Sequence, residues 1–128
     1  MSQENVEIVR QSFEAYVRGD LSAALASFDA DIVFNPAEEA PIHGRDAVLA
    51  YIQRWEDPWE DYEAEAEEFI DAGDRVVVTL HFKGRGKGSG IEVDARFHQV
   101  HTLRDGKLVR MDEYLDRDEA LQAAGLRE

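Results

Sequence analysis

The chain has 128 residues, with 28 acidic against 14 basic side chains, a net charge of -14 and no cysteine. This length favours a single domain over residues 1–128, and the missing cysteine excludes disulfide and thiolate chemistry. The negative charge repels phosphates and anionic headgroups, so we expect no nucleic-acid or membrane partner. Neither a signal peptide nor a membrane-length apolar run is evident, so we expect a cytoplasmic protein.

The first half of the sequence predicts helices. Apolar residues recur at helical spacing up to Val17, and Gly19 ends that helix. Asp20 is a suitable cap for a second helix, whose apolar face runs to Phe28. A short strand over 32–35 follows, and then a third helix from near Arg45 to Pro58.

The second half predicts strands over the ranges 62–71, 75–83, 91–104 and 108–115, followed by a short last helix. The apolar and acidic alternation slips at Glu67-Glu68, which indicates a β-bulge that bends the sheet. The segment 84–90 is glycine-rich and reads as a flexible hairpin link. Three helices followed by antiparallel strands favour an α+β class, with a curved antiparallel sheet wrapped as a cone around the N-terminal helices.

The segment from Asn35-Pro36 to Pro41-Ile42-His43-Gly44-Arg45 resembles the SnoaL-like and ketosteroid isomerase-like family of the nuclear transport factor 2-like superfamily. The segments 103–107 and 114–126 look like a SnoaL-like group, and the likeness spans essentially the whole chain. The resemblance implies the cone-shaped α+β roll of that superfamily.

In the isomerase, a Tyr and a protonated Asp hold an enolate oxygen while a second Asp acts as base. The resemblance places these roles on Ser12, Gln99 and Asn35, respectively. A neutral amide is a poor proton acceptor, so Asn35 argues against steroid isomerisation by that mechanism. Gln99 can still donate a hydrogen bond to a ligand oxygen.

Period-2 alternation places Gln99 and Glu113 on the inner, apolar faces of their strands, with His101 nearer the rim. One hypothesis makes Glu113 a cavity acid or base with a raised pKa, assisted by Gln99, Asn35 or His101. The alternative is a structural Glu113 bonded to Asn35, Gln99 or a tyrosine. His101 is consistent with a base, a ligand donor or a satisfied rim residue, and the last reading is favoured.

Aromatic side chains offer walls for a small apolar ligand, although the same residues are also consistent with plain core. Those we expect to line such a site are Tyr16, Phe34, Trp55, Tyr51, Phe82 and Phe97. No cofactor is implied. His81 and His98 lie on outer faces without further ligands at suitable spacing, so we expect no metal.

A polar row of Asp94, Arg96 and His98 lies on the outer face of the sheet, with apolar Val77, Val100, Leu108 and Tyr114 among the charges. Such a mixed face suits a homodimer interface. A one-residue register shift would instead turn the row inward, as in limonene epoxide hydrolase-like relatives.

Two functions remain open from the sequence. The first is a cofactor-independent acid/base enzyme, such as an isomerase, cyclase or hydrolase, acting on a small apolar ligand. The second is a ligand-binding or accessory dimerisation module without turnover. The family resemblance favours the first.

Overall fold

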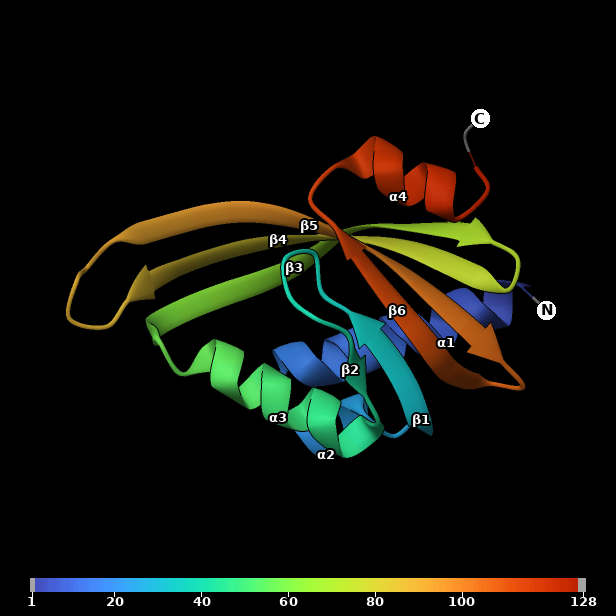
Figure 1. Ribbon diagram of the computed structural model, residues 1–128, viewed down its shortest axis with the longest axis horizontal. Helices are drawn as coiled ribbons and strands as arrows, with labels where there is room; N and C mark the ends of the chain where they lie inside the picture. The colour runs from blue at the N-terminus through green and yellow to red at the C-terminus, as the bar shows by residue number, and fades with distance from the viewer. Residues whose placement is uncertain (1, 127–128) are drawn as a thin grey trace.

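A six-stranded sheet separates three helices on one side from a single helix on the other in the computed structural model, which describes residues 2–126 (Figure 1). The helices are α1 (Ser2–Val17), α2 (Leu21–Ala24), α3 (Arg45–Glu56) and α4 (Arg117–Ala123). The strands are β1 (Phe28–Asn35), β2 (Ile42–His43), β3 (Trp59–Ala72), β4 (Arg75–Gly86), β5 (Glu92–Arg104) and β6 (Lys107–Tyr114). This arrangement confirms the α+β class.

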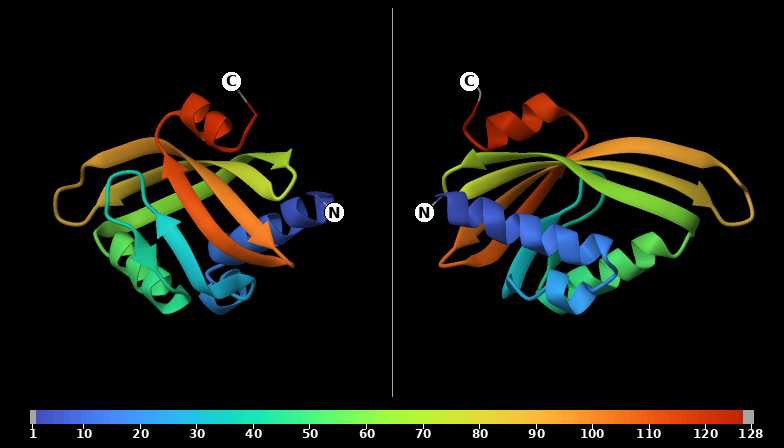
Figure 2. Two further views of the ribbon diagram at one scale, coloured as in Figure 1. Left: turned by 45° about the vertical axis from the view of Figure 1, so that its right-hand side comes forward. Right: turned by 180° about the vertical axis from the view of Figure 1, so that it is seen from behind.

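The strand order is β2-β1-β6-β5-β4-β3, so the first long strand lies beside the last one. Every neighbouring pair is antiparallel except β1 and β6, which run parallel. The sheet is strongly curved, and the long β3–β5 strands extend beyond the helices at one end (Figure 2). The sequence did not predict the parallel pair, because it joins segments far apart in the chain.

The predicted β-bulge is confirmed on β3, where the register with β4 shifts between Ala66 and Glu68. Ala66 pairs with Leu80 and Phe69 with Val78, so the slip lets Phe69 join the same apolar face as Ala66. A bulge increases local twist and bends the strand. It is thus one cause of the curvature that encloses the helices.

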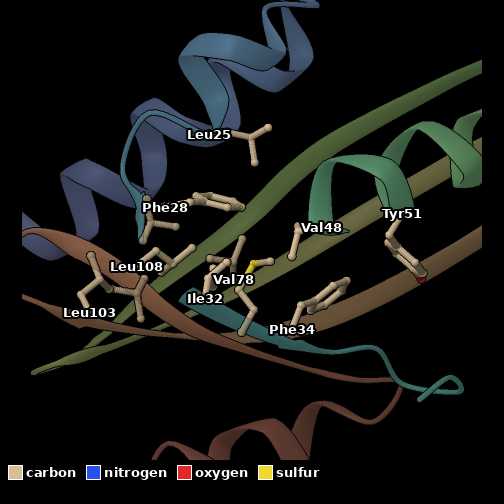
Figure 3. Packing of buried hydrophobic residues seen from close by; sticks show 12 residues of the cluster. Leu25, Phe28, Ile32, Phe34, Val48, Tyr51, Val78, Leu103 and Leu108 are labelled. Atoms are coloured by element: carbon tan, nitrogen blue, oxygen red, sulfur yellow. The ribbon is translucent and has the colours of Figure 1, made fainter. Parts of the chain in front are cut away.

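The main hydrophobic core fills the concave side of the sheet, beneath α1, α2 and α3. Figure 3 shows Val48 and Tyr51 reaching from α3 toward Phe34 of β1, with Val78 of β4 nearby. A second, smaller cluster joins α4 to the opposite face through Val77, Val100, Ala120, Leu121 and Ala124. Because β4 is covered on both faces, its run Val76-Val77-Val78 is wholly buried.

Several boundaries differ from the prediction. Helix α2 ends at Ala24, and Phe28 begins β1, because its ring packs in the core from the strand. β4 continues through Gly86, so Gly84 pairs with Tyr62 and Val93 instead of lying in a flexible link.

The alternation on β6 is also interrupted. A register shift beside Leu103 pairs that residue with Leu108, so Leu108 is buried in the main core and the prediction of an outer position was wrong. Val77 and Val100 do face outward, but α4 covers them. Leu115 follows the end of β6 and is 52% exposed.

Candidate functional site

A pocket of about 170 Å³ lies between the helices and the concave face of the sheet. Its volume is close to that of the ~150 Å³ engineered apolar cavity that binds benzene, and below the roughly 300–1,000 Å³ typical of drug-sized ligands. Most lining side chains are apolar, and none of those in the described part of the chain is Lys or Arg. The polar ones are Ser12, Tyr16, Tyr51, Gln99, His101 and Glu113.

Strand pairing sets the order of side chains along the pocket. Gln99 of β5 lies opposite Glu113 of β6, and His101 opposite Met111, one inward position further along the strands. In the other direction Phe97 lies opposite Leu80 of β4. Successive inward positions on a strand are roughly 7 Å apart. The pocket therefore has a polar part at Gln99, His101 and Glu113, and an aromatic part beyond Phe97.

Glu113 is held by neutral hydrogen-bond donors. The Gln99 side-chain amide donates to one carboxylate oxygen at 3.0 Å, and the backbone N–H of Ala37 donates to the other at 3.3 Å. Burial is the main cause of the raised pKa of Glu113, and the two donors act against it. No cation among the described residues forms an ion pair with this carboxylate, so its proton affinity remains enhanced.

His101 extends the same chain of hydrogen bonds. Its Nε2 lies 3.0 Å from the side-chain oxygen of Gln99, and only 8% of the residue is exposed. Burial lowers the pKa of His101 to about 4, so the ring is neutral near pH 7. Its Nδ1 is buried with no hydrogen-bond partner among the described residues.

Two tyrosine hydroxyls line the pocket as protonated groups. Burial raises the pKa of Tyr16, and the neighbouring Tyr62 and Glu56 raise it further. Burial likewise raises the pKa of Tyr51, with Glu113 and Glu39 adding to the effect. Both hydroxyls therefore stay protonated at neutral pH, where Tyr16 bonds to Tyr62 and Glu56, and Tyr51 bonds to Glu39.

The aromatic part is a set of edge-to-face contacts. The ring centroids of Trp55 and Phe82 are 4.6 Å apart, and those of Trp55 and Phe97 are 6.1 Å apart. Phe34 and Tyr51 meet in the same way at 5.3 Å. All six aromatic residues expected near a ligand line the pocket, and their role in binding remains a prediction.

A family model described as a SnoaL-like domain matches residues 9–111. The chain belongs to the SnoaL-like family. This confirms the resemblance drawn from the segment around Asn35. No curated protein matches the sequence significantly.

Solved structures share the fold of this SnoaL-like protein. An NTF2-like protein of unknown function from Burkholderia pseudomallei is 25% identical, with a TM-score of 0.79 and coverage of 93% of this chain and 95% of that one. A proposed polyketide cyclase from Sinorhizobium meliloti is 27% identical, with a TM-score of 0.70 and coverage of 84% and 93%. A proposed SnoaL-like polyketide cyclase from Jannaschia is 20% identical, with a TM-score of 0.81 and coverage of 99% and 95%. At that identity the last likeness shows the fold alone.

Asn35 is the predicted site residue that the SnoaL-like structure leaves outside the pocket. Its side-chain amide donates to Asp112 at 2.8 Å, on the strand next to its own, and Asn35 is not among the lining residues. Ser12 does line the pocket, but its hydroxyl donates to the carbonyl of Ala24 at 2.6 Å and ties α1 to α2. Of the residues expected to assist Glu113, Gln99 and His101 therefore remain the candidates.

The sequence reasoning missed a polar group beside Tyr16. The hydroxyl of Tyr62 on β3 donates to the carboxylate of Glu56, the last residue of α3, over 2.5 Å. Both residues raise the pKa of Tyr16. A signal was present, because Tyr62 shares its strand face with Ala64, which lines the pocket.

The row Asp94, Arg96 and His98 remains on the outer face, so the alternative register is wrong. Asp94 contacts His81 at 2.6 Å, Arg96 contacts Glu67 at 2.8 Å, and His98 contacts Thr79 at 2.9 Å. Within residues 2–126, no group of three or more His, Cys, Asp or Glu side chains is arranged to hold a metal ion. None of the described helices is long and apolar enough to cross a membrane.

Proposed function

We propose that this SnoaL-like protein binds a small, neutral, largely apolar ligand in its pocket and moves a proton on that ligand with Glu113. The observation that carries the proposal is a buried carboxylate in an apolar pocket, which among the described residues bonds only to the neutral donors Gln99 and Ala37. A perturbed carboxylate in such surroundings is a candidate acid or base. The name of the Sinorhizobium meliloti relative supports a cyclase-type reaction.

In the proposed reaction, ionised Glu113 removes a proton from a carbon next to a carbonyl group. The C–H electron pair moves toward the carbonyl oxygen, giving an enolate. The enolate either attacks a second carbonyl carbon, which closes a ring and gives an alkoxide that takes the proton from Glu113, or receives that proton back at another carbon. The Tyr51 hydroxyl remains protonated, and it would stabilise the developing oxygen charge by exchanging its hydrogen bond to Glu39 for one to the ligand. A raised pKa strengthens the base at neutral pH.

Ligand binding is tested by thermal shift with small neutral ring compounds on the wild type and on an Ala64→Phe variant. Ala64 lines the pocket, so the larger side chain should fill it. A ligand at 100 times its Kd adds about 2.7 kcal/mol to the free energy of unfolding. The control is Glu65→Gln, because Glu65 pairs with His81 on the outer face. Equal shifts in both variants would place binding elsewhere.

Turnover separates the enzyme from a binding module with the same pocket. A bound ketone in deuterated buffer should exchange hydrogen at the carbon beside its carbonyl group, and NMR of the ligand measures the rate. Exchange at the rate of ligand alone, together with a clear thermal shift, would indicate a binding module. An exchange rate that depends on Glu113 identifies the enzyme, because a general base typically contributes ~10²–10⁴ in rate.

We also propose a homodimer through the part of the outer face that α4 leaves uncovered, around His81, Asp94 and Arg96. The ion pairs of His81 with Asp94 and Arg96 with Glu67 support it, because they give this face charges of both signs. Sedimentation that finds only monomers at micromolar concentration would contradict it. A cytoplasmic location stays a prediction.

A further inference from the structure

The pocket occupies a short stretch of the concave face of the sheet. Its lining residues take three successive inward positions on each of two strands: Val78, Leu80 and Phe82 on β4, and Phe97, Gln99 and His101 on β5. The next inward residues of β5 are Leu103, which lies in the core, and Ala95 at the other end, and neither lines the pocket. Since successive inward positions are roughly 7 Å apart, the lined stretch is roughly 14 Å long on each strand.

At one end of this stretch lies Trp55, in the last turn of α3. Its ring centroid is 4.6 Å from that of Phe82 and 6.1 Å from that of Phe97, and all three side chains line the pocket. Trp59 lies 5.7 Å from Trp55 and 5.0 Å from Phe82, yet it does not line the pocket. Trp55 and Phe82 therefore separate Trp59 from the ligand space, and the pocket ends at this group of rings.

The concave face of the sheet continues beyond Trp55. The long β3–β5 strands extend past the helices at that end (Figure 2). Their inward residues there are Tyr62, Gly84 and Val93, which pair across the three strands. Tyr62 is 37% exposed, so solvent reaches this part of the face. Removing the indole of Trp55 would therefore lengthen the pocket toward this open region, whereas the opposite end of the pocket meets the core.

The position of Glu113 sets how much of a ligand fits on the Trp55 side. Glu113 lies opposite Gln99, and Phe97 is the next inward residue of β5, roughly 7 Å away. A ligand whose reactive carbon lies at Glu113 therefore has room for one six-membered ring before it meets the indole. The pocket volume of about 170 Å³ agrees, because an apolar cavity of ~150 Å³ holds a single benzene ring. A second ring in line with the first would have to displace Trp55 from its neighbours.

We propose that the pocket accepts neutral ligands with one ring, or open chains of the same size, and that Trp55 sets this limit. Trp55 is thus a specificity-determining residue: it provides the wall against which the far side of the ligand packs, and its indole occupies the place that a second ring would need. This inference rests on the proposed ligand-binding function and adds the size class of the ligand and the residue that determines it.

The test compares two neutral methyl ketones, acetophenone with one ring and 4-acetylbiphenyl with a second ring in line with the first. Equilibrium dialysis gives the Kd of each. Apolar area alone would make the larger probe bind more tightly, so a preference for the smaller one reports a size limit. We expect wild type to bind acetophenone about tenfold or more tightly than 4-acetylbiphenyl, because the second ring costs the contacts of Trp55 with its neighbouring rings.

Two variants at Trp55 complete the test. Trp55→Ala removes the indole, and Trp55→Leu leaves a smaller apolar side chain, so the second keeps the test valid if the first does not fold. Both should bind 4-acetylbiphenyl more tightly than acetophenone, by about tenfold in Trp55→Ala, because the second ring enters the vacated space. The control is Leu121→Ala, which removes a buried side chain from the cluster under α4 on the opposite face of the sheet. It should keep the preference of wild type.

The outcomes separate this inference from the function on which it rests. Wild type that binds both ketones equally, or the larger one better, overturns the size limit and leaves the ligand pocket standing. A preference for acetophenone that persists in both Trp55 variants would assign the limit to another wall of the pocket. Loss of all binding in both variants would make Trp55 a required contact instead of a limit, and either result overturns the inference. Failure of both ketones to bind wild type and every variant would overturn the proposed function as well.

Discussion

Gln99 and Glu113 lie directly opposite each other on β5 and β6, and the Gln99 amide donates to the Glu113 carboxylate at 3.0 Å. The pairing matters because an amide satisfies the carboxylate without neutralising it. An Arg or Lys at the same place would hold the pKa of Glu113 low, as opposite charges do. With Gln99, burial remains the dominant influence and the pKa stays raised. The pair is thus suited to proton transfer, and its consequences can be measured.

Glu113→Gln tests the proposed base directly. The amide has the same shape but cannot accept a proton usefully, so hydrogen exchange on the bound ligand should fall by ~10²–10⁴-fold. Ligand affinity should change by less than about threefold, because the pocket shape is kept. Ligand NMR and thermal shift measure the two quantities, with the exposed α4 residue Glu119→Gln as control. Turnover equal to wild type would exclude Glu113 as the base.

The lowered pKa of His101 should make the stability of the protein depend on pH. Its pKa is about 4 when folded and about 6.5 when unfolded, so between these values the unfolded chain binds more protons. The free energy of unfolding should therefore rise as pH increases through this window, by about 3 kcal/mol from this residue. Urea unfolding at several pH values measures it. His101→Phe should flatten the profile, and an unchanged slope would contradict the buried neutral ring.

Glu113 should change the pH dependence of the free energy of unfolding in the opposite direction. Its pKa is raised in the folded state, so its contribution falls as pH rises above the value of an exposed carboxyl group. The free energy of unfolding of Glu113→Gln, relative to that of wild type, should therefore be higher at neutral pH than at pH 4. The same urea series measures this difference, and a difference of the opposite sign would indicate that the carboxylate is well solvated.

Asn35→Asp restores the residue type of the isomerase base but should not create a base in the pocket. The new carboxylate would face Asp112, whose oxygen lies 2.8 Å from the present amide nitrogen. We expect a loss of about 1–2 kcal/mol at pH 7, which acidification should relieve because protonation of one of the two facing carboxyl groups removes their repulsion. Asn35→Ala is the control and should lose about 1 kcal/mol without that pH dependence. A gain in steroid isomerisation would show that the side chain reaches the pocket.

Gly84→Ala tests how the β4 backbone supports the aromatic part of the pocket. An added Cβ would lie 2.6 Å from the Phe82 ring and 3.0 Å from that of Trp59. Because Phe82 packs on Trp55, the ring cannot move freely, and we expect a loss of about 1–3 kcal/mol with weaker ligand binding. The control is Lys83→Ala, at the exposed position next to Gly84. Calorimetric unfolding that finds both variants equal would show that Phe82 relaxes without cost.

The sequence located the polar part of the pocket better than the isomerase resemblance did. Alternation along 91–104 placed Gln99 and His101 on one face, and both line the pocket. The resemblance placed Asn35 beside them, but its amide bonds to Asp112 instead. A matching position in a motif does not determine which neighbour a side chain bonds, because that depends on the strand beside it.

Local patterns determined which segments form helices and strands and which face of each is apolar, because periodicity and burial act over a few residues. Only the tertiary structure decided the parallel pairing of β1 with β6, the register that sets Gln99 opposite Glu113, and the lack of a partner for His101 Nδ1 within residues 2–126. These depend on how distant segments meet when loops close and side chains pack, and no local pattern carries that information.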